Sequence, residues 1–232
     1  MLIDELSKPS RRKSWLAPRC VVCALKPGSP VCAGCEHDFF APDTHRCERC
    51  ALRLPASADR ACGACLSEPP PFDASAALAD YVAPVAGMIA ALKFGGRIDL
   101  ADVFARLLAS REPVRPVGDL VVPVPLSFER ESERGFNQSL EIARRYARLT
   151  RTTLAERALS RLRHTAPQQS LAREERQRNV RGAFGVDVPV RGRCIVVIDD
   201  VMTTGSTLGE VAQVLKRAGA ARVVNRVVAR TR

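Results

Sequence analysis

Apolar residues follow two different spacings along the chain. Short apolar runs of strand length alternate with longer stretches in which apolar residues recur every three or four positions, as on one face of a helix. The short runs predict strands at 76–82, 120–124, 194–198 and 222–229. The periodic stretches predict helices at 84–93, 100–108, 138–149 and 208–218. The last strand, helix and strand form a βαβ crossover, so we expect an α/β fold with a parallel sheet flanked by helices.

Local signals mark the ends of the predicted helices. Pro84 suits the first turn of its helix, and Asp99 and Asn137 are residue types that cap helix N-termini. Gly219 follows the last helical stripe and is placed to end it. The stretch 125–135 after the second strand is expected to be a loop.

A rigid stretch separates the sheet pattern from the N-terminal region. Residues 68–72 read Glu-Pro-Pro-Pro-Phe, and consecutive prolines block helix formation and remove donors from a strand. We therefore predict two domains, a small N-terminal module at 1–67 and the α/β domain at 68–232.

The N-terminal module contains eight of the nine cysteines, arranged as Cys-x-x-Cys pairs. The pairs are Cys20/Cys23, Cys32/Cys35, Cys47/Cys50 and Cys62/Cys65. A two-residue gap lets both thiolates bind one cation, and two pairs complete a tetrahedral zinc site. The pattern predicts two structural zinc ions, bound by the pairs in sequence order or in an interleaved arrangement. A disulfide scaffold is disfavoured without a secretion signal, and the ninth cysteine, Cys194, is expected to be a buried small apolar residue.

Composition and charge narrow the class of protein. The 232 residues are 46% hydrophobic and 26% charged, which excludes a fully disordered chain. The net charge is +11, and 31 of the 36 basic residues are arginine, which pairs well with phosphates and carboxylates. This composition favours a phosphate-bearing ligand or nucleic acid, although a genome rich in arginine codons explains it equally well. The arginine-rich stretch 161–182 is expected to be a loop.

The sequence also bears on location. Its longest stretch without a charged residue, 81–92, has 12 residues, fewer than the roughly 18 that a membrane-spanning helix needs. The N-terminus has acidic residues where a secretory signal has basic ones, and no apolar segment follows. We therefore expect a cytoplasmic protein with no membrane insertion.

The segment 195–207 contains the strongest candidate for chemistry. A predicted strand ends in Asp199 and Asp200, and the chain continues through Thr203-Thr-Gly-Ser-Thr207 into a helix. Backbone N–H groups and hydroxyls at a helix N-terminus favour a phosphate, and Gly205 allows its close approach. The two carboxylates would repel a phosphate but accept hydrogen bonds from ribose hydroxyls. The alternative is an ordinary strand-loop-helix connection with Thr and Ser caps.

This segment resembles the phosphoribosyl pyrophosphate (PRPP) fingerprint of type I phosphoribosyltransferases. The resemblance implies that Asp199 and Asp200 are catalytic residues that bind the ribose hydroxyls. It also implies that Thr203, Thr204, Gly205, Ser206 and Thr207 surround the 5′-phosphate. Mg²⁺ would accompany PRPP, since hard oxygen ligands suit it.

A wider set of motifs resembles the ComF family of competence-associated proteins. The motifs are the four Cys-x-x-Cys pairs, 92–97 (Leu-Lys-Phe-Gly-Gly-Arg), 122–125 (Val-Pro-Val-Pro), 134–138 (Arg-Gly-Phe-Asn-Gln) and 182–184 (Gly-Ala-Phe), with Thr165, Gln168, Leu171, Arg176 and Asn179. The resemblance implies a double zinc ribbon joined to a type I phosphoribosyltransferase domain, and a link to DNA uptake in natural transformation.

Three functions are compatible with these observations. The first is a phosphoribosyltransferase of unknown acceptor, in which the loop after residue 124 holds the pyrophosphate; its candidate residues are Pro125, Leu126, Arg134, Arg163 and Arg176. The second is a PRPP sensor without catalysis. The third is a module that handles single-stranded DNA beside a competence helicase or translocase.

Overall fold

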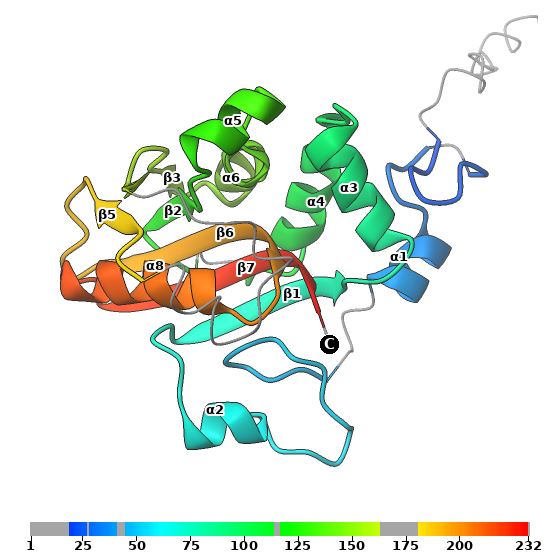
Figure 1. The fold of residues 1–232 in the computed structure, drawn as a ribbon. Helices are drawn as coiled ribbons and strands as arrows, with labels where there is room; N and C mark the ends of the chain where they lie inside the picture. The colour runs from blue at the N-terminus through cyan, green and yellow to red at the C-terminus, as the bar shows by residue number, and fades with distance from the viewer. Residues whose placement is uncertain (1–18, 27, 41–44, 114–116, 163–180, 232) are drawn as a thin grey trace, which may run out of the picture. The chain divides into compact units, whose positions relative to one another are not determined.

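A computed structural model describes residues 19–26, 28–40, 45–113, 117–162 and 181–231 (Figure 1). Within these residues, one sheet has five strands. Across the sheet they are β1 (Ala74–Asp80), β7 (Arg222–Arg230), β6 (Cys194–Met202), β2 (Leu120–Pro123) and β3 (Thr153–Leu154). Every neighbouring pair in this sheet is parallel.

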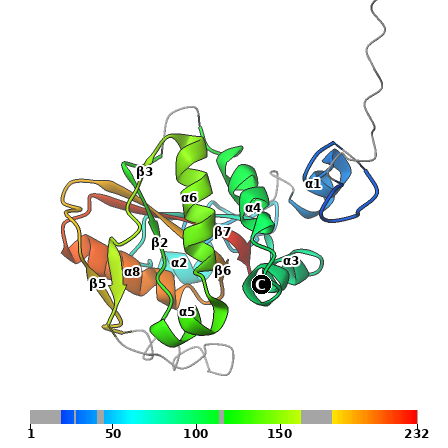
Figure 2. The same ribbon diagram turned by 90° about the horizontal axis from the view of Figure 1, so that it is seen from above.

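Helices cover both faces of this sheet (Figures 1 and 2). The long ones are α3 (Val85–Phe94), α4 (Asp99–Ala109), α6 (Gln138–Thr150) and α8 (Ser206–Arg217). The step from β2 through α6 to β3 runs across the sheet in the opposite direction to the step from β6 through α8 to β7. Right-handed crossovers therefore place α6 and α8 on opposite faces. The predicted α/β class, a parallel sheet flanked by helices, is confirmed.

The reversal of direction between β2 and β6 determines where a ligand can bind. The chain leaving the carboxyl end of β2 turns toward one face, whereas the chain leaving β6 turns toward the other. Such a switch point opens a crevice at the carboxyl ends of the two strands. The segment 199–207 lies at this edge of the sheet.

The described residues also form shorter elements. They are α1 (Ala33–Phe39), α2 (Gly63–Ser67), α5 (Phe128–Arg134), and an antiparallel pair formed by β4 (Leu159–Arg161) and β5 (Phe184–Val186). α1 and α2 each begin directly after a cysteine, Cys32 and Cys62, which occupies the N-cap position. The pairs Cys32/Cys35 and Cys62/Cys65 therefore lie at the start of short helices.

The chain divides into two compact units, residues 1–40 and 41–232. The first unit contains the first two cysteine pairs. The second unit contains the other two pairs together with the sheet, and its apolar core includes Cys47, Cys65, Phe72 and Met202. The predicted boundary between domains 1–67 and 68–232 stays a prediction.

Several local predictions need correction. Asp99 is the first residue of α4 rather than its cap, which is Ile98, and its carboxylate accepts hydrogen bonds from Arg97 at 2.8 and 2.7 Å. The predicted loop 125–135 contains the helix α5, whose seven residues are too few to show an apolar stripe. The predicted strand 194–198 continues to Met202, because its last residues still pair with β7.

Other local predictions are confirmed. The side chain of Asn137 accepts hydrogen bonds from the N–H groups of Ser139 and Leu140, at 2.9 and 3.3 Å, and so caps α6. Gly219 follows α8 with a φ of +95°, as expected of a residue that ends a helix. The predicted loop 161–182 falls mostly on residues 163–180, which lie outside the described residues. Among the described helices, none combines the length and apolar character needed to cross a membrane.

Candidate functional site

The candidate phosphate loop connects the carboxyl end of β6 to the N-terminus of α8. Gly205 is the N-cap of α8 with a φ of +83°, a conformation that L side chains rarely adopt. A Cβ atom at this position would lie 2.7 Å from Cε of Met202. The strand, tight turn and helix expected from the sequence are therefore present, and the turn requires glycine.

Polar groups of this loop converge at the start of α8. The hydroxyls of Thr204 and Ser206 lie 2.7 Å apart, and the Ser206 N–H donates to the Thr204 hydroxyl at 3.3 Å. A small cleft opens here. Its lining includes Asp199, Met202, Thr203, Gly205, Ser206 and Thr207. The structure thus brings the predicted phosphate-binding residues together with one of the two predicted ribose-binding carboxylates.

Asp199 is held by a hydrogen bond from the far side of the switch point. The Ser139 hydroxyl, in the first turn of α6, donates to its Oδ1 at 3.0 Å, and the Asp200 N–H donates to the same atom at 2.9 Å. Burial, reinforced by the neighbouring charge of Asp200, raises the pKa of Asp199 to about 7. Near neutral pH this carboxyl is therefore shared between its acid and its carboxylate form.

Asp200 forms an ion pair with a residue that sequence reasoning did not identify. Nζ of Lys93, at the end of α3, lies 2.8 Å from Oδ2 of Asp200. The two side chains are 17% and 6% exposed, so the pair is largely shielded from water. Lys93 stands inside the motif 92–97 on which the ComF resemblance partly rests. The motif therefore pointed to Lys93, but it did not identify Asp200 as the partner of Lys93.

The candidates on the loop after β2 occupy the other side of the crevice. The backbone carbonyl of Pro125 accepts a hydrogen bond from Arg161 at 3.5 Å, and Leu126 follows Pro125 just ahead of α5. Arg134 donates to Gln138 at 2.8 Å and lies 4.9 Å from the ring centre of Phe94.

Arg134 lies close enough to Asp200 for the two charges to interact. Burial lowers its pKa, and the charge of Asp200 acts in the opposite direction. The described candidates from the two loops are therefore gathered at one edge of the sheet. Arg163 and Arg176 lie outside the described residues.

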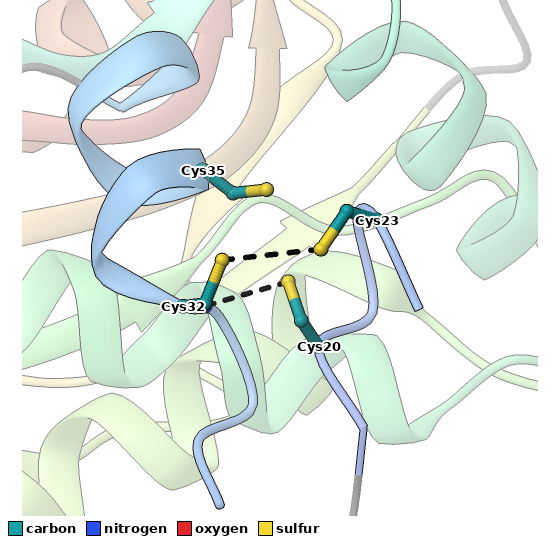
Figure 3. A group of neighbouring side chains, drawn as sticks. All are labelled: Cys20, Cys23, Cys32 and Cys35. Atoms are coloured by element: carbon teal, nitrogen blue, oxygen red, sulfur yellow. Dashed lines mark hydrogen bonds between the residues drawn. The ribbon is translucent and has the colours of Figure 1, made fainter. Parts of the chain in front are cut away.

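The cysteines form two clusters of four, paired in sequence order. The first cluster contains Cys20, Cys23, Cys32 and Cys35 (Figure 3), and the second contains Cys47, Cys50, Cys62 and Cys65. In each cluster the four sulfur atoms lie within 4.8 Å of one another. The structure thus excludes the interleaved arrangement that the sequence left open.

The geometry of both clusters fits a tetrahedral zinc ion. The Sγ atoms of Cys23 and Cys32 are 3.9 Å apart, and those of Cys50 and Cys62 are 3.7 Å apart. A tetrahedron with Zn–S bonds of about 2.3 Å has sulfur atoms about 3.8 Å apart. The spacing is therefore that of a closed structural site with four thiolates.

Backbone donors prepare two of these sulfurs to ionise. The N–H of Cys32 donates to Cys20 Sγ, and the N–H of Cys62 donates to Cys47 Sγ, both at 3.3 Å. Although burial acts in the opposite direction, the combined backbone donors lower the pKa of Cys20 to about 6 and that of Cys47 to about 7. Burial and the neighbouring thiols raise the pKa of Cys35 to about 12, so four thiolates need a cation among them.

The remaining cysteine, Cys194, and His37 are members of neither cluster. Cys194 is partly exposed rather than buried, and its thiol donates to the carbonyl of Val117 at 3.1 Å. Its pKa is raised by burial. The side chain of His37 is 87% exposed, so it is a surface residue beside the first cluster.

Comparison with known proteins identifies relatives over most of the chain. DNA utilization protein YhgH of Escherichia coli is 38% identical over 200 residues, which cover 83% of this chain and 87% of that protein. The chain belongs to the ComF family. Competence protein F of Haemophilus influenzae is 29% identical over 82% of this chain and 85% of that protein. For Competence protein ComFC of Bacillus subtilis the identity is 28%, over 87% of this chain and 84% of the relative.

Similarity of this ComF family member to solved structures is partial. A glutamine PRPP amidotransferase from B. subtilis, complexed with ADP and GMP, matches 56% of this chain and 26% of its own with a TM-score of 0.40 and 22% identity. A purine phosphoribosyltransferase from Pyrococcus horikoshii matches 60% of this chain and 85% of its own with a TM-score of 0.32 and 16% identity. No protein-family model matches the chain.

Proposed function

We propose that this ComF family member binds PRPP with Mg²⁺ at the loop between β6 and α8. The observation that carries the proposal is the arrangement of Asp199 and Asp200 at the carboxyl end of β6, directly before Thr203 to Thr207 at the N-terminus of a twelve-residue helix. Acidic acceptors next to an anion-binding helix end suit a ligand that combines a ribose with a phosphate. A free phosphate would not need the carboxylates.

Each part of PRPP has a matching group in this arrangement. The 5′-phosphate would accept hydrogen bonds from N–H groups and hydroxyls at 203–207, and the ribose hydroxyls would donate to Asp199 and Asp200. Mg²⁺ would bind oxygens of the pyrophosphate and the ribose. Lys93 and Arg134 would supply positive charge at the opposite side of the crevice, toward the pyrophosphate.

Such a site supports displacement of pyrophosphate from C1 of the ribose by a nucleophile. Stabilisation of the charge on the leaving group contributes more to this reaction than a nucleophilic side chain. When PRPP binds, Lys93 would exchange its contact with Asp200 for the pyrophosphate, which leaves Asp200 to accept from the ribose. We therefore propose a phosphoribosyltransferase, with a PRPP sensor that lacks transfer activity as the alternative.

The relatives suggest the process that this activity serves. One is named for DNA utilization and two are named for competence. We propose that PRPP binding in this chain is linked to the uptake or use of DNA. We further propose that both cysteine clusters hold structural zinc, because their sulfur spacing and backbone donors match that ion.

Calorimetry with Mg²⁺ and PRPP tests the binding site. We expect Asp200→Asn to weaken binding by about 1.5 to 3 kcal/mol, the contribution of a hydrogen bond to a charged group. Asp102→Asn is the matched control, because Asp102 pairs only locally with Arg106 along α4. Equal affinity of wild type and Asp200→Asn would contradict the proposed site.

Pyrophosphate release distinguishes the enzyme from the sensor. Wild-type protein should release pyrophosphate from PRPP when the right acceptor is present in a panel of nucleobases and amines. Asp200→Asn should reduce that release, whereas Asp102→Asn should not. PRPP binding without release for any acceptor in the panel would favour the sensor.

A further inference from the structure

Arg230 connects the second cysteine cluster to the candidate phosphate loop. It is the last residue of β7, and it is only 8% exposed. Its Nε donates to the backbone carbonyl of Cys50 at 3.0 Å. Its Nη1 donates to the carbonyl of Met202 at 3.2 Å and also to the carbonyl of Thr203. One buried guanidinium thus binds a cysteine ligand's backbone and the first residues of the loop.

The position of Arg230 in the sheet explains this reach. In the register of the strands it lies opposite Met202 of β6 on one side and Asp80 of β1 on the other. It therefore stands at the carboxyl edge of the sheet, where β6 ends and the phosphate loop begins. The Thr231 N–H donates to the Met202 carbonyl at 3.1 Å, which adds a second bond at this point.

The second cysteine cluster is attached to β1 by further contacts. Nη2 of Arg46 lies 2.8 Å from Oδ1 of Asp80, and both side chains are largely buried. The Ser75 N–H of β1 donates to the carbonyl of Glu48 at 2.9 Å. The four cysteines share one apolar core with Met202 and Leu208. This cluster is therefore part of the sheet unit, whereas the first cluster belongs to the unit 1–40.

The cysteine turn determines where the Cys50 carbonyl points. The Ala51 N–H donates to the carbonyl of Cys47 at 2.8 Å, and Ala51 has a φ of +58°. This turn between two metal ligands has a left-handed residue directly after Cys50. A metal bound by Cys47 and Cys50 would hold the turn closed. Without the metal, the turn is less constrained, and the Cys50 carbonyl can turn away from Arg230.

We propose that metal binding at the second cluster positions the phosphate loop, and that Arg230 transmits this effect as a positioning residue. The inference rests on the proposed PRPP site for its functional meaning. A buried guanidinium needs acceptors for its N–H groups, so loss of the Cys50 carbonyl loosens the hold of Arg230 on Met202 and Thr203. Release of metal from the second cluster then lowers PRPP affinity, whereas release of metal from the first cluster does not change it.

Amide hydrogen exchange in the full chain tests the coupling without reference to PRPP. The readout is exchange at residues 203–209, which includes the Gly209 N–H that donates to Gly205 at 2.7 Å. Cys50→Ser should speed this exchange by about tenfold or more, as expected for loss of one hydrogen bond to a charged group. Cys23→Ser, in the first cluster, is the matched control and should leave it unchanged.

Arg230→Lys keeps the test valid if Cys50→Ser does not fold. Lysine retains the charge but lacks the planar fork whose separate nitrogens reach the Cys50 and Met202 carbonyls. We expect zinc content to stay at the wild-type value, exchange at 203–209 to rise, and PRPP affinity to fall by about tenfold. Arg226→Lys is the control, since Arg226 lies on the same strand but pairs with Glu112.

The outcomes separate this inference from the proposed function. Faster exchange at 203–209 in Arg230→Lys and not in Arg226→Lys supports the coupling. Failure of the wild-type protein to bind PRPP would contradict the proposed function and leave this result on the coupling intact. The coupling would be overturned if the exchange rate at 203–209 stays within twofold of wild type in both Arg230→Lys and a folded Cys50→Ser, whatever the PRPP affinity. A twofold change in rate corresponds to about 0.4 kcal/mol. A rise of equal size in Cys23→Ser would also overturn it.

Discussion

Burial of the Asp199 carboxyl makes the free energy of unfolding of the protein depend on pH. Its pKa rises from the ordinary aspartate value of 3.8 to about 7, mainly through burial and then through the charge of Asp200. Between these values the folded chain keeps a proton that the unfolded chain has lost. The folded state then binds more protons, so the free energy of unfolding decreases as pH rises through this window.

Asp199→Asn should remove this dependence. Asparagine can still accept from the Ser139 hydroxyl and the Asp200 N–H, but it does not ionise. Relative to wild type, we expect the variant to gain stability from pH 4 to 7, by at most about 1.4 kcal/mol per pH unit, and no further gain above. Urea unfolding at pH 5 and pH 8 measures the difference. Parallel stability profiles for Asp199→Asn and wild type would show that Asp199 is not the titrating group.

At the scale of elements, the first turn of α6 links helix capping to the site. Asn137 accepts from two N–H groups of this turn, and its Nδ2 donates to the carbonyl of Val124 at 3.0 Å. The same turn presents the Ser139 hydroxyl to Asp199. The cap therefore holds together α6, the end of β2 and one of the two carboxylates.

Asn137→Ala should lower the free energy of unfolding by about 1 to 2 kcal/mol for the lost cap, with an additional cost for the unpaired Val124 carbonyl. Asn137→Ser keeps a side-chain acceptor for the helix and loses the donor to Val124, so its loss should be smaller. Chemical denaturation of both variants gives the comparison. Equal losses would mean that the bond to Val124, and not the helix cap, provides the stability.

At the scale of the whole molecule, each cysteine cluster should stabilise a different unit of the chain. Elemental analysis of the purified protein should give two zinc ions per chain, one for each cluster of four sulfurs. Cys20→Ser should give one zinc ion and unfold only the unit 1–40, since metal binding supplies the folding energy of such small modules.

The second cluster should respond differently because it belongs to the core of the sheet unit. Cys47→Ser should lower the denaturation midpoint of the sheet unit. In Cys20→Ser this midpoint should stay near the wild-type value. Loss of both zinc ions in Cys20→Ser, or a folded protein without metal, would contradict this assignment.

Local spacing in the sequence was enough to determine some features of this protein. The Cys-x-x-Cys pairs predicted metal clusters, and the apolar run before Asp199 with the Thr-Thr-Gly-Ser-Thr turn predicted a strand, a loop and a helix. The cap at Asn137 was also predictable. In each case the interacting groups are close in the chain, so residue type and spacing decide the geometry.

Tertiary structure alone decided which distant groups meet. Lys93 pairs with Asp200, Ser139 binds Asp199, and Arg230 joins Cys50 to Thr203. Nothing in residue spacing selects these partners, because the two members of each pair lie far apart in the sequence. The order of the strands brings them together: β6 lies between β2 and β7, so the ends of these three strands meet at one edge. Pairing with β7 likewise extended β6 to Met202, since cross-strand hydrogen bonds depend on a partner elsewhere in the chain.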